Sequence, residues 1–216
     1  MPANTMSTEH TLSELVANLI VAVIRAPDRT SAVRSVEALV AGGVRDIEIT
    51  YSTPEAAEVM AELDRRYGGD IVLGAGTIRQ PAQAREAAEA GARFLVSPGT
   101  TASLASSMVQ TGTLLLFGAL TPSDIMNATE LGASVIKIFP ASLGGPAYLR
   151  SLRGPFPDVP FCPTGGVNPT TIPEWLDAGA LLLGAGSELC SVSDLAAGRW
   201  NTVTDNARTF IKAAGR

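Results

Sequence analysis

The chain has 216 residues, of which 46% are hydrophobic and 17% charged, and this balance excludes a disordered or fibrous protein. A formal charge of −5 without a basic tract argues against nucleic acid or an anionic membrane as a partner. With one histidine, His10, and two unrelated cysteines, the composition disfavours a His-based metal site, a Ser-His-Asp triad and a disulfide framework, so no metal or cofactor is expected.

Residues 1–10 are polar and irregular, and the sequence predicts a flexible N-terminal segment there, followed by one domain over residues 11–216. From residue 20 onward, short apolar runs alternate with turns and Ala-rich amphipathic segments. The predicted strands cover 20–24, 44–49, 71–73, 94–96, 114–117, 135–139, 159–163 and 181–183. The predicted helices cover 31–41, 54–67, 81–90, 101–110, 122–131, 146–153, 172–178 and 205–213.

Strands that alternate with helices favour right-handed crossovers and a parallel sheet. Eight such units predict a single-domain α/β protein, a (β/α)8 TIM barrel with a short N-terminal extension or helix. A doubly wound open sheet is the alternative, but no G-x-G-x-x-G segment opens a helix. No run of about 18 apolar residues is present and the polar N-terminus does not resemble a signal peptide, so a cytoplasmic protein is expected.

Lys137 is a candidate catalytic residue, because it is one of only two lysines among the sixteen basic residues and lies within a predicted strand. Strand alternation places it on one face with Val135 and Phe139, and both faces of a barrel strand are covered. Burial disfavours the charged ammonium, and a neutral amine can condense with a substrate carbonyl, which arginine cannot do. The alternative is a structural lysine that pairs with a buried carboxylate or reaches the rim of the barrel.

Two further charges lie late in predicted strands, where a barrel carries its chemistry. Glu48 shares a face with Thr50 and could move protons beside an imine carbon, or could simply form an ion pair with Lys137 or Arg25. Arg25 ends the first strand, where a guanidinium can bind a carboxylate or phosphate, although a surface arginine is equally consistent with this position. Asp46 lies earlier in its strand and is interpreted as structural.

Three glycine-rich turns are predicted after strands, at 74–77, 164–167 and 184–187. Glycine tolerates positive φ and lets backbone N–H groups converge on an anion. The last two turns follow strands seven and eight, where barrels often hold phosphate, and they carry the hydroxyls of Thr164 and Ser187. Tight turns without a ligand are the alternative.

The segments VAVIRA (21–26), GGVRDIEIT (42–50), GAGT (74–77), VSPG (96–99), IKIFPA (136–141), GPFPDVPFCPTGGV (154–167) and LGAGSEL (183–189) occur in order across the chain. With these motifs the chain resembles the 2-keto-3-deoxy-6-phosphogluconate (KDPG) aldolases, also called the KHG/KDPG aldolase family. The resemblance implies a metal-free class I aldolase on a (β/α)8 barrel, a homotrimer of the Entner–Doudoroff pathway. Its substrate would be cleaved to pyruvate and glyceraldehyde 3-phosphate.

The resemblance also implies roles for individual residues. Lys137 matches the Schiff-base lysine and Glu48 the acid/base glutamate. Arg25, assisted by Thr50, is assigned to the pyruvate carboxylate. The residues that match the pocket lining and the phosphate or polar-tail site are Thr77, Pro98, Phe139, Thr164, Gly165, Gly166, Gly186 and Ser187.

Two departures from the family pattern bear on the substrate. Some members carry an arginine after the catalytic glutamate in a Thr-Leu-Arg-Thr stretch, whereas this chain has Ser52 there. The family often has Pro-Gly after strand five, whereas this chain has Phe117-Gly118, which predicts a bulkier element near the mouth. Galactonate-derived isomers and 4-hydroxy-2-oxoglutarate therefore remain alternative substrates. The rival functions are a phosphate-binding isomerase or synthase and a sugar-acid sensor without turnover.

Overall fold

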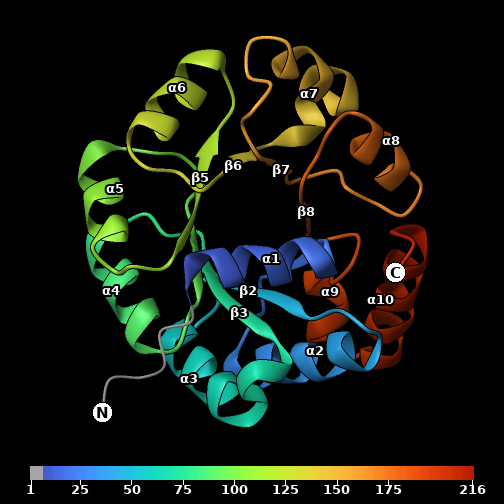
Figure 1. Ribbon diagram of the computed structural model, residues 1–216. Coiled ribbons are helices and arrows are strands. Elements are labelled where there is room, and N and C mark those ends of the chain that lie inside the picture. Colours follow the sequence, from blue (N-terminus) through green and yellow to red (C-terminus); the bar gives the residue numbers. More distant parts are fainter. Residues whose placement is uncertain (1–6) are drawn as a thin grey trace.

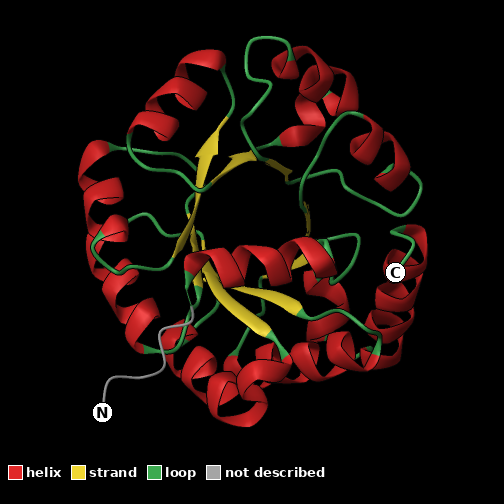
Figure 2. Cartoon of the chain, viewed as in Figure 1, coloured by secondary structure: helices red, strands yellow, loops and turns green. Residues whose placement is uncertain are grey.

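Eight short parallel strands form the wall of a barrel, and helices surround them on the outside (Figure 1, Figure 2). The computed structural model describes residues 7–216. The strands are β1 (Ile20–Ile24), β2 (Asp46–Thr50), β3 (Val72–Gly76), β4 (Phe94–Val96), β5 (Leu114–Ala119), β6 (Val135–Ile138), β7 (Phe161–Pro163) and β8 (Leu183–Ala185). The helices are α1 (Thr8–Asn18), α2 (Arg29–Ala41), α3 (Ala56–Tyr67), α4 (Pro81–Glu89), α5 (Ala102–Val109), α6 (Pro122–Glu130), α7 (Gly145–Arg153), α8 (Ile172–Asp177), α9 (Val192–Ala196) and α10 (Trp200–Ala213).

The strand order confirms the barrel and rejects the doubly wound sheet. Neighbouring strands follow chain order from β1 to β7, and β8 pairs with β1, so the order never reverses at a switch point. The remaining gap, between β7 and β8, is crossed by a parallel bridge between Thr164 and Gly184. None of the helices between residues 7 and 216 is both long and apolar enough to cross a lipid bilayer.

Side chains of the strands alternate between two cores, as the period of two requires. Ile47, Ile49, Ile136 and Ile138 belong to the larger core between the strands and the outer helices. A smaller core fills the lumen, and α1 contributes Leu15 to it. Figure 1 shows α1 lying across one opening of the barrel. The members of this lumen core are Leu15, Val21, Val72, Phe94, Val96, Leu114, Leu116, Val135, Cys162 and Leu182.

Some element boundaries differ from the sequence prediction. Residues 1–6 of the predicted flexible segment lie outside the described residues, whereas Thr8 begins α1 because the Ser7 hydroxyl accepts a hydrogen bond from the His10 amide. Helix α3 begins at Ala56 rather than at Pro54, because Glu55 adopts a left-handed backbone with φ of 54°. The short helix α9 was not predicted, and α10 begins five residues before the predicted start at 205.

Candidate active site

A lysine and a glutamate meet inside the barrel. Lys137 on β6 and Glu48 on β2 face the lumen, and only 3% and 2% of their surfaces are exposed. The Lys137 Nζ atom lies 3.6 Å from Glu48 Oε1 and 5.5 Å from the centre of the Phe139 ring. No described residue donates a hydrogen bond to Glu48 Oε1. The two side chains therefore lie within ion-pair distance of each other in a site shielded from bulk water, and Glu48 Oε1 has no hydrogen-bond partner among the described residues.

Strand alternation places both groups, as the sequence predicted. Ile136 and Ile138 flank Lys137 and pack outward, which turns the lysine to the lumen. In register, Lys137 lies between Gly118 of β5 and Cys162 of β7. The Cys162 thiol stays protonated, because burial raises its pKa to about 12. Lys137 thus has a protonated thiol, and no second charged group, as its register neighbour on β7.

Two glycines of β3 leave room for larger side chains of the neighbouring strands β2 and β4. A Cβ atom on Gly76 would stand 1.7 Å from Glu48 Oε1, and one on Gly74 would stand 2.4 Å from the Phe94 ring. Gly184 serves Thr164 in the same way, since an added Cβ would stand 2.2 Å from the Thr164 hydroxyl. These glycines are required for space rather than for backbone conformation.

The predicted glycine turns at 74–77 and 184–187 are therefore wrong in their first residues, which belong to β3 and β8. The sequence pattern missed this because glycine inside a strand looks like glycine in a turn. Only the turn at 164–167 has the predicted backbone, with φ of 97° at Gly165 and 79° at Gly166. Neither of these two amides donates to a carbonyl within residues 7–216, so both remain available to an anion.

Four other predicted site residues lie just after the carboxyl ends of β3, β7 and β8. Thr164 is buried, and its hydroxyl lies 3.9 Å from the Cys162 sulfur. Gly186 and Ser187 follow β8, and Ser187 is exposed. Thr77 follows β3 and adopts φ of 56°, which is rare for a β-branched residue and marks a strained position beside the lumen.

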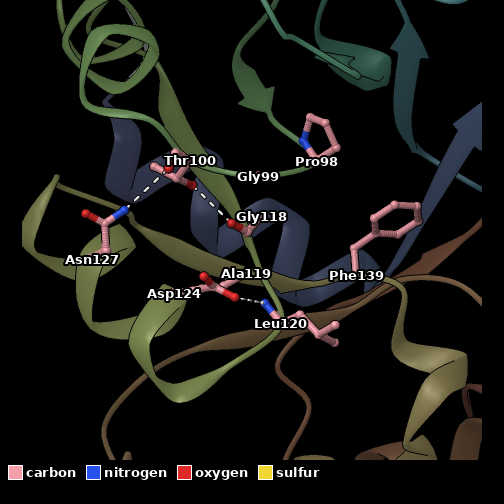
Figure 3. A pocket seen from close by; sticks show the side chains of 9 residues that line it. All are labelled: Pro98, Gly99, Thr100, Gly118, Ala119, Leu120, Asp124, Asn127 and Phe139. Carbon is pink, nitrogen blue, oxygen red and sulfur yellow. Dashed lines mark hydrogen bonds between the residues drawn. The ribbon is translucent and has the colours of Figure 1, made fainter.

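Pro98 and Phe139 line a cavity of about 170 Å³ between the loops that follow β4, β5 and β6 (Figure 3). Their rings lie on one side of it, opposite Asn127 and Thr100. Hydrogen bonds join Asn127 to the Thr100 carbonyl and Thr100 to the Gly118 carbonyl. Only Pro98 and Phe139 of this lining were predicted from the sequence, because the other residues come from loops whose proximity depends on the packing of neighbouring strands. The full lining is Pro98, Gly99, Thr100, Gly118, Ala119, Leu120, Asp124, Asn127 and Phe139.

Phe117 corrects one expectation about the substrate. Its ring is fully buried and packs in the outer core, because Gly118 takes the lumen-facing position. A Cβ atom at Gly118 would collide with the backbone of Pro98. The Phe117 ring therefore adds no bulk at the mouth of the barrel.

Arg25 and Thr50 lie at the ends of neighbouring strands but differ in their exposure to solvent. Arg25 is exposed just after β1, and no carboxylate of residues 7–216 lies within ion-pair distance of it. Thr50 is fully buried, and its hydroxyl donates to the Ile24 carbonyl at 2.8 Å. The guanidinium of Arg25 is thus accessible to solvent, whereas the Thr50 hydroxyl is bonded to the scaffold.

Asp46 lies below Glu48 on the same face of β2 and has the structural role expected of it. Asn18 of α1 donates a hydrogen bond of 2.6 Å to its carboxyl group. Burial raises the pKa of Asp46 well above its usual value, and the hydrogen bond from Asn18 offsets this only in part. Asp46 thus ties α1 to the amino end of the barrel.

Comparison with known proteins identifies the family. The sequence model of the KDPG and KHG aldolases matches residues 12–206. The chain belongs to the KDPG and KHG aldolase family. It is 36% identical to the KHG/KDPG aldolase of Escherichia coli (strain K12), over 94% of this chain and 95% of that protein. It is 35% identical to the 2-dehydro-3-deoxy-phosphogluconate aldolase of Pseudoalteromonas atlantica, over 90% and 91%.

Solved structures agree with this assignment. The KDPG aldolase of Legionella pneumophila, with pyruvate captured as a covalent carbinolamine, superposes with a TM-score of 0.85 at 30% identity, over 95% of this chain and 98% of that one. A 2-dehydro-3-deoxy-6-phosphogalactonate aldolase of E. coli is 30% identical over 90% and 93% of the two chains. The protein is therefore a carbon–carbon lyase of the aldolase type, which sets aside the isomerase, synthase and sensor alternatives.

Proposed function

We propose that this aldolase cleaves KDPG to pyruvate and glyceraldehyde 3-phosphate through a Schiff base on Lys137, and that it also cleaves 4-hydroxy-2-oxoglutarate to pyruvate and glyoxylate. The observation that carries the proposal is the buried Lys137–Glu48 pair, with Nζ and Oε1 separated by 3.6 Å. An amine and a proton carrier in contact, shielded from water, are the two groups that imine chemistry requires.

The first half of the reaction builds the imine. Transfer of a proton from Lys137 to the free oxygen of Glu48 leaves a neutral amine. The amine attacks the C2 ketone of the substrate, and the proton that the attacking nitrogen loses moves to the ketone oxygen to give a neutral carbinolamine. Glu48 returns its proton to the departing hydroxyl, water leaves, and a protonated imine remains.

The second half breaks the carbon–carbon bond. The cationic imine withdraws electrons from C3–C4, while the Glu48 carboxylate accepts the proton of the C4 hydroxyl. The aldehyde leaves, and the electron pair of the broken C3–C4 bond forms the enamine of pyruvate. Protonation at C3 and hydrolysis then release pyruvate and the free amine. The carbinolamine captured in the Legionella relative is an intermediate of the kind this route requires.

Substrate contacts follow from where charges and free amides lie. We assign the substrate carboxylate to the unpaired Arg25, and the phosphate or polar tail to the free amides of Gly165 and Gly166. Thr164, which follows β7, and Gly186 and Ser187, which follow β8, are assigned to the same second site. We assign Thr77, Pro98 and Phe139, of which the last two line the loop cavity, to the part of the substrate between its charged ends.

Borohydride trapping tests the Schiff base. Reduction in the presence of pyruvate is expected to modify Lys137 and leave Lys212, the other lysine and an exposed one, unmodified in the peptide map. Lys137→Arg keeps the charge but forbids the imine, so trapping and cleavage should both be lost. Lys212→Arg is the matched control and should retain both. An unmodified Lys137 peptide, or cleavage by Lys137→Arg, contradicts the mechanism.

The galactonate-derived isomer is the second candidate substrate. The absence of an arginine at Ser52 is the observation that favours it. The two phosphorylated sugar acids differ at C4, so kcat/KM measured for each separates the two assignments. A higher value for the galactonate isomer would replace KDPG as the main substrate.

Three wider assignments concern assembly, location and pathway. We infer a homotrimer, a cytoplasmic location and a place in the Entner–Doudoroff pathway. Light scattering coupled to gel filtration tests the first, and fractionation of the source cells tests the second. Loss of growth on gluconate after deletion of the encoding gene tests the third.

A further inference from the structure

The segment that follows β2 holds the backbone on both sides of Arg25. The Thr50 hydroxyl donates to the carbonyl of Ile24 at 2.8 Å, and the Thr53 hydroxyl accepts from the amide of Ala26 at 3.1 Å. Thr50, at the end of β2, and Thr53, in the loop that follows it, therefore hold the two peptide groups that flank Arg25. Both threonines are buried, with exposures of 0% and 3%.

The segment is itself well anchored. The Thr53 amide donates to the Thr50 carbonyl at 2.9 Å, and the Thr50 and Ser52 hydroxyls are 2.7 Å apart. The Tyr51 amide donates to the Gly76 carbonyl of β3 at 2.8 Å. The loop that holds Arg25 is thus connected to the strand that gives Glu48 its space.

The strand register brings Arg25 close to the reacting pair. Val23 of β1 is the register partner of Glu48, so Arg25 lies two residues further toward the mouth on the same side of β1. Its guanidinium is exposed and unpaired within residues 7–216, although its backbone is fixed. A charged group on a fixed backbone loses less conformational freedom when a ligand binds.

We infer that Thr50 and Thr53 are positioning residues, which fix Arg25 so that it binds the carboxylate of the keto acid next to the Lys137–Glu48 pair. The inference rests on the carboxylate role proposed for Arg25. The stretch after Glu48 supplies hydroxyl groups that hold the backbone around an arginine at the end of the neighbouring strand. Thr50 then acts on the backbone of Arg25 rather than on the substrate.

Thr53 gives the cleaner test, because Thr50 belongs to the strand that carries Glu48. Thr53→Val keeps the shape and removes the acceptor, and Thr53→Ser retains it. We expect Thr53→Val to raise KM for the keto acid by about three- to tenfold, the range of one hydrogen bond, with kcat within about twofold. Thr53→Ser should restore KM. Thr53→Ala provides a second loss-of-acceptor variant if the valine variant folds poorly.

A double-mutant cycle with Arg25→Met separates positioning from general damage. Arg25→Met should raise KM by about ten- to a hundredfold, the range of a charged hydrogen-bonded pair. In that background Thr53→Val should change KM no further, because the group it positions is gone. An equal effect of Thr53→Val in both backgrounds, or none in either, overturns the inference.

The cycle also distinguishes the two proposals. If Arg25→Met leaves KM unchanged, the carboxylate role of Arg25 fails and the inference fails with it, whereas borohydride trapping at Lys137 is unaffected. If Arg25→Met raises KM but Thr53→Val and Thr53→Ala do not, the carboxylate role stands and only the positioning inference is wrong.

Discussion

Gly76 shows how a missing side chain can shape a catalytic residue's surroundings. The Glu48 carboxyl group occupies the volume that a Cβ atom on Gly76 would fill, with 1.7 Å between them. Because Gly76 is part of β3 and its φ is not positive, alanine fits the backbone there. The substitution therefore acts on the site through volume alone.

Gly76→Ala is expected to displace the Glu48 carboxyl group from Lys137 and to lower kcat/KM by about 10²-fold or more, the usual contribution of a positioned acid–base group. Steady-state cleavage assays measure this. Gly69→Ala is the matched control, since its added Cβ would meet no atom within 4 Å. Full activity in a folded Gly76→Ala variant would contradict the assigned geometry.

The elements surrounding the site were predicted from the sequence because alternation and helix signals are local. The lumen faces of β2 and β6 follow from the isoleucines that flank Glu48 and Lys137. The space left by Gly76 and the outward position of Phe117 depend on the neighbouring strands, which a single sequence does not display. Pro98 and Phe139 were predicted to line a pocket, but the rest of the loop cavity was missed for the same reason.

Helix α1 is tied to the barrel by a carboxyl group whose charge is unfavourable. Asp46 is fully buried, and one of its oxygens, Oδ2, has no hydrogen-bond partner among the described residues. Its folded pKa is raised above the unfolded value, so the folded state holds a proton that the unfolded state has lost. Stability from this group is present below the unfolded pKa and falls as pH rises toward the raised value.

Asp46→Asn removes this titration while keeping an oxygen for Asn18. The unfolding free energy of the variant relative to the parent should therefore increase with pH above about 4, the ordinary Asp range, and level off above the raised pKa. Urea unfolding between pH 5 and pH 8 measures the difference. The exposed Asp205→Asn change serves as control. A difference that is constant across this range would show that Asp46 does not titrate in it.

At the scale of the whole molecule, the barrel wall is uneven. The β2–β3 pair is in register from Asp46↔Val72 to Thr50↔Gly76, whereas β7 and β8 meet at the Thr164↔Gly184 bridge. Pro163, the last residue of β7, has no amide hydrogen to contribute. The wall is thus least supported beside the free Gly165 and Gly166 amides.

Hydrogen exchange should report this difference. Peptides that cover residues 161–166 and 181–186 are expected to exchange earlier than those that cover 46–50 and 72–76, because local opening needs fewer broken hydrogen bonds. Exchange followed by mass spectrometry, corrected for intrinsic rates, measures the order. Equal protection of the two regions would mean that the helices outside, rather than the ladder, hold β7 to β8.

The position of α1 determines by which end of the barrel the substrate enters and the products leave. Leu15 joins the apolar filling of the lumen, so among the described residues the amino end of the barrel is blocked by a helix and a dry core. Substrate, water, aldehyde and pyruvate must all use the opposite end. In the proposed reaction the aldehyde has to depart past a pyruvate fragment still bonded to Lys137, which imposes an obligatory order of release. Pyruvate should then act as a competitive product inhibitor, and the aldehyde as a noncompetitive one.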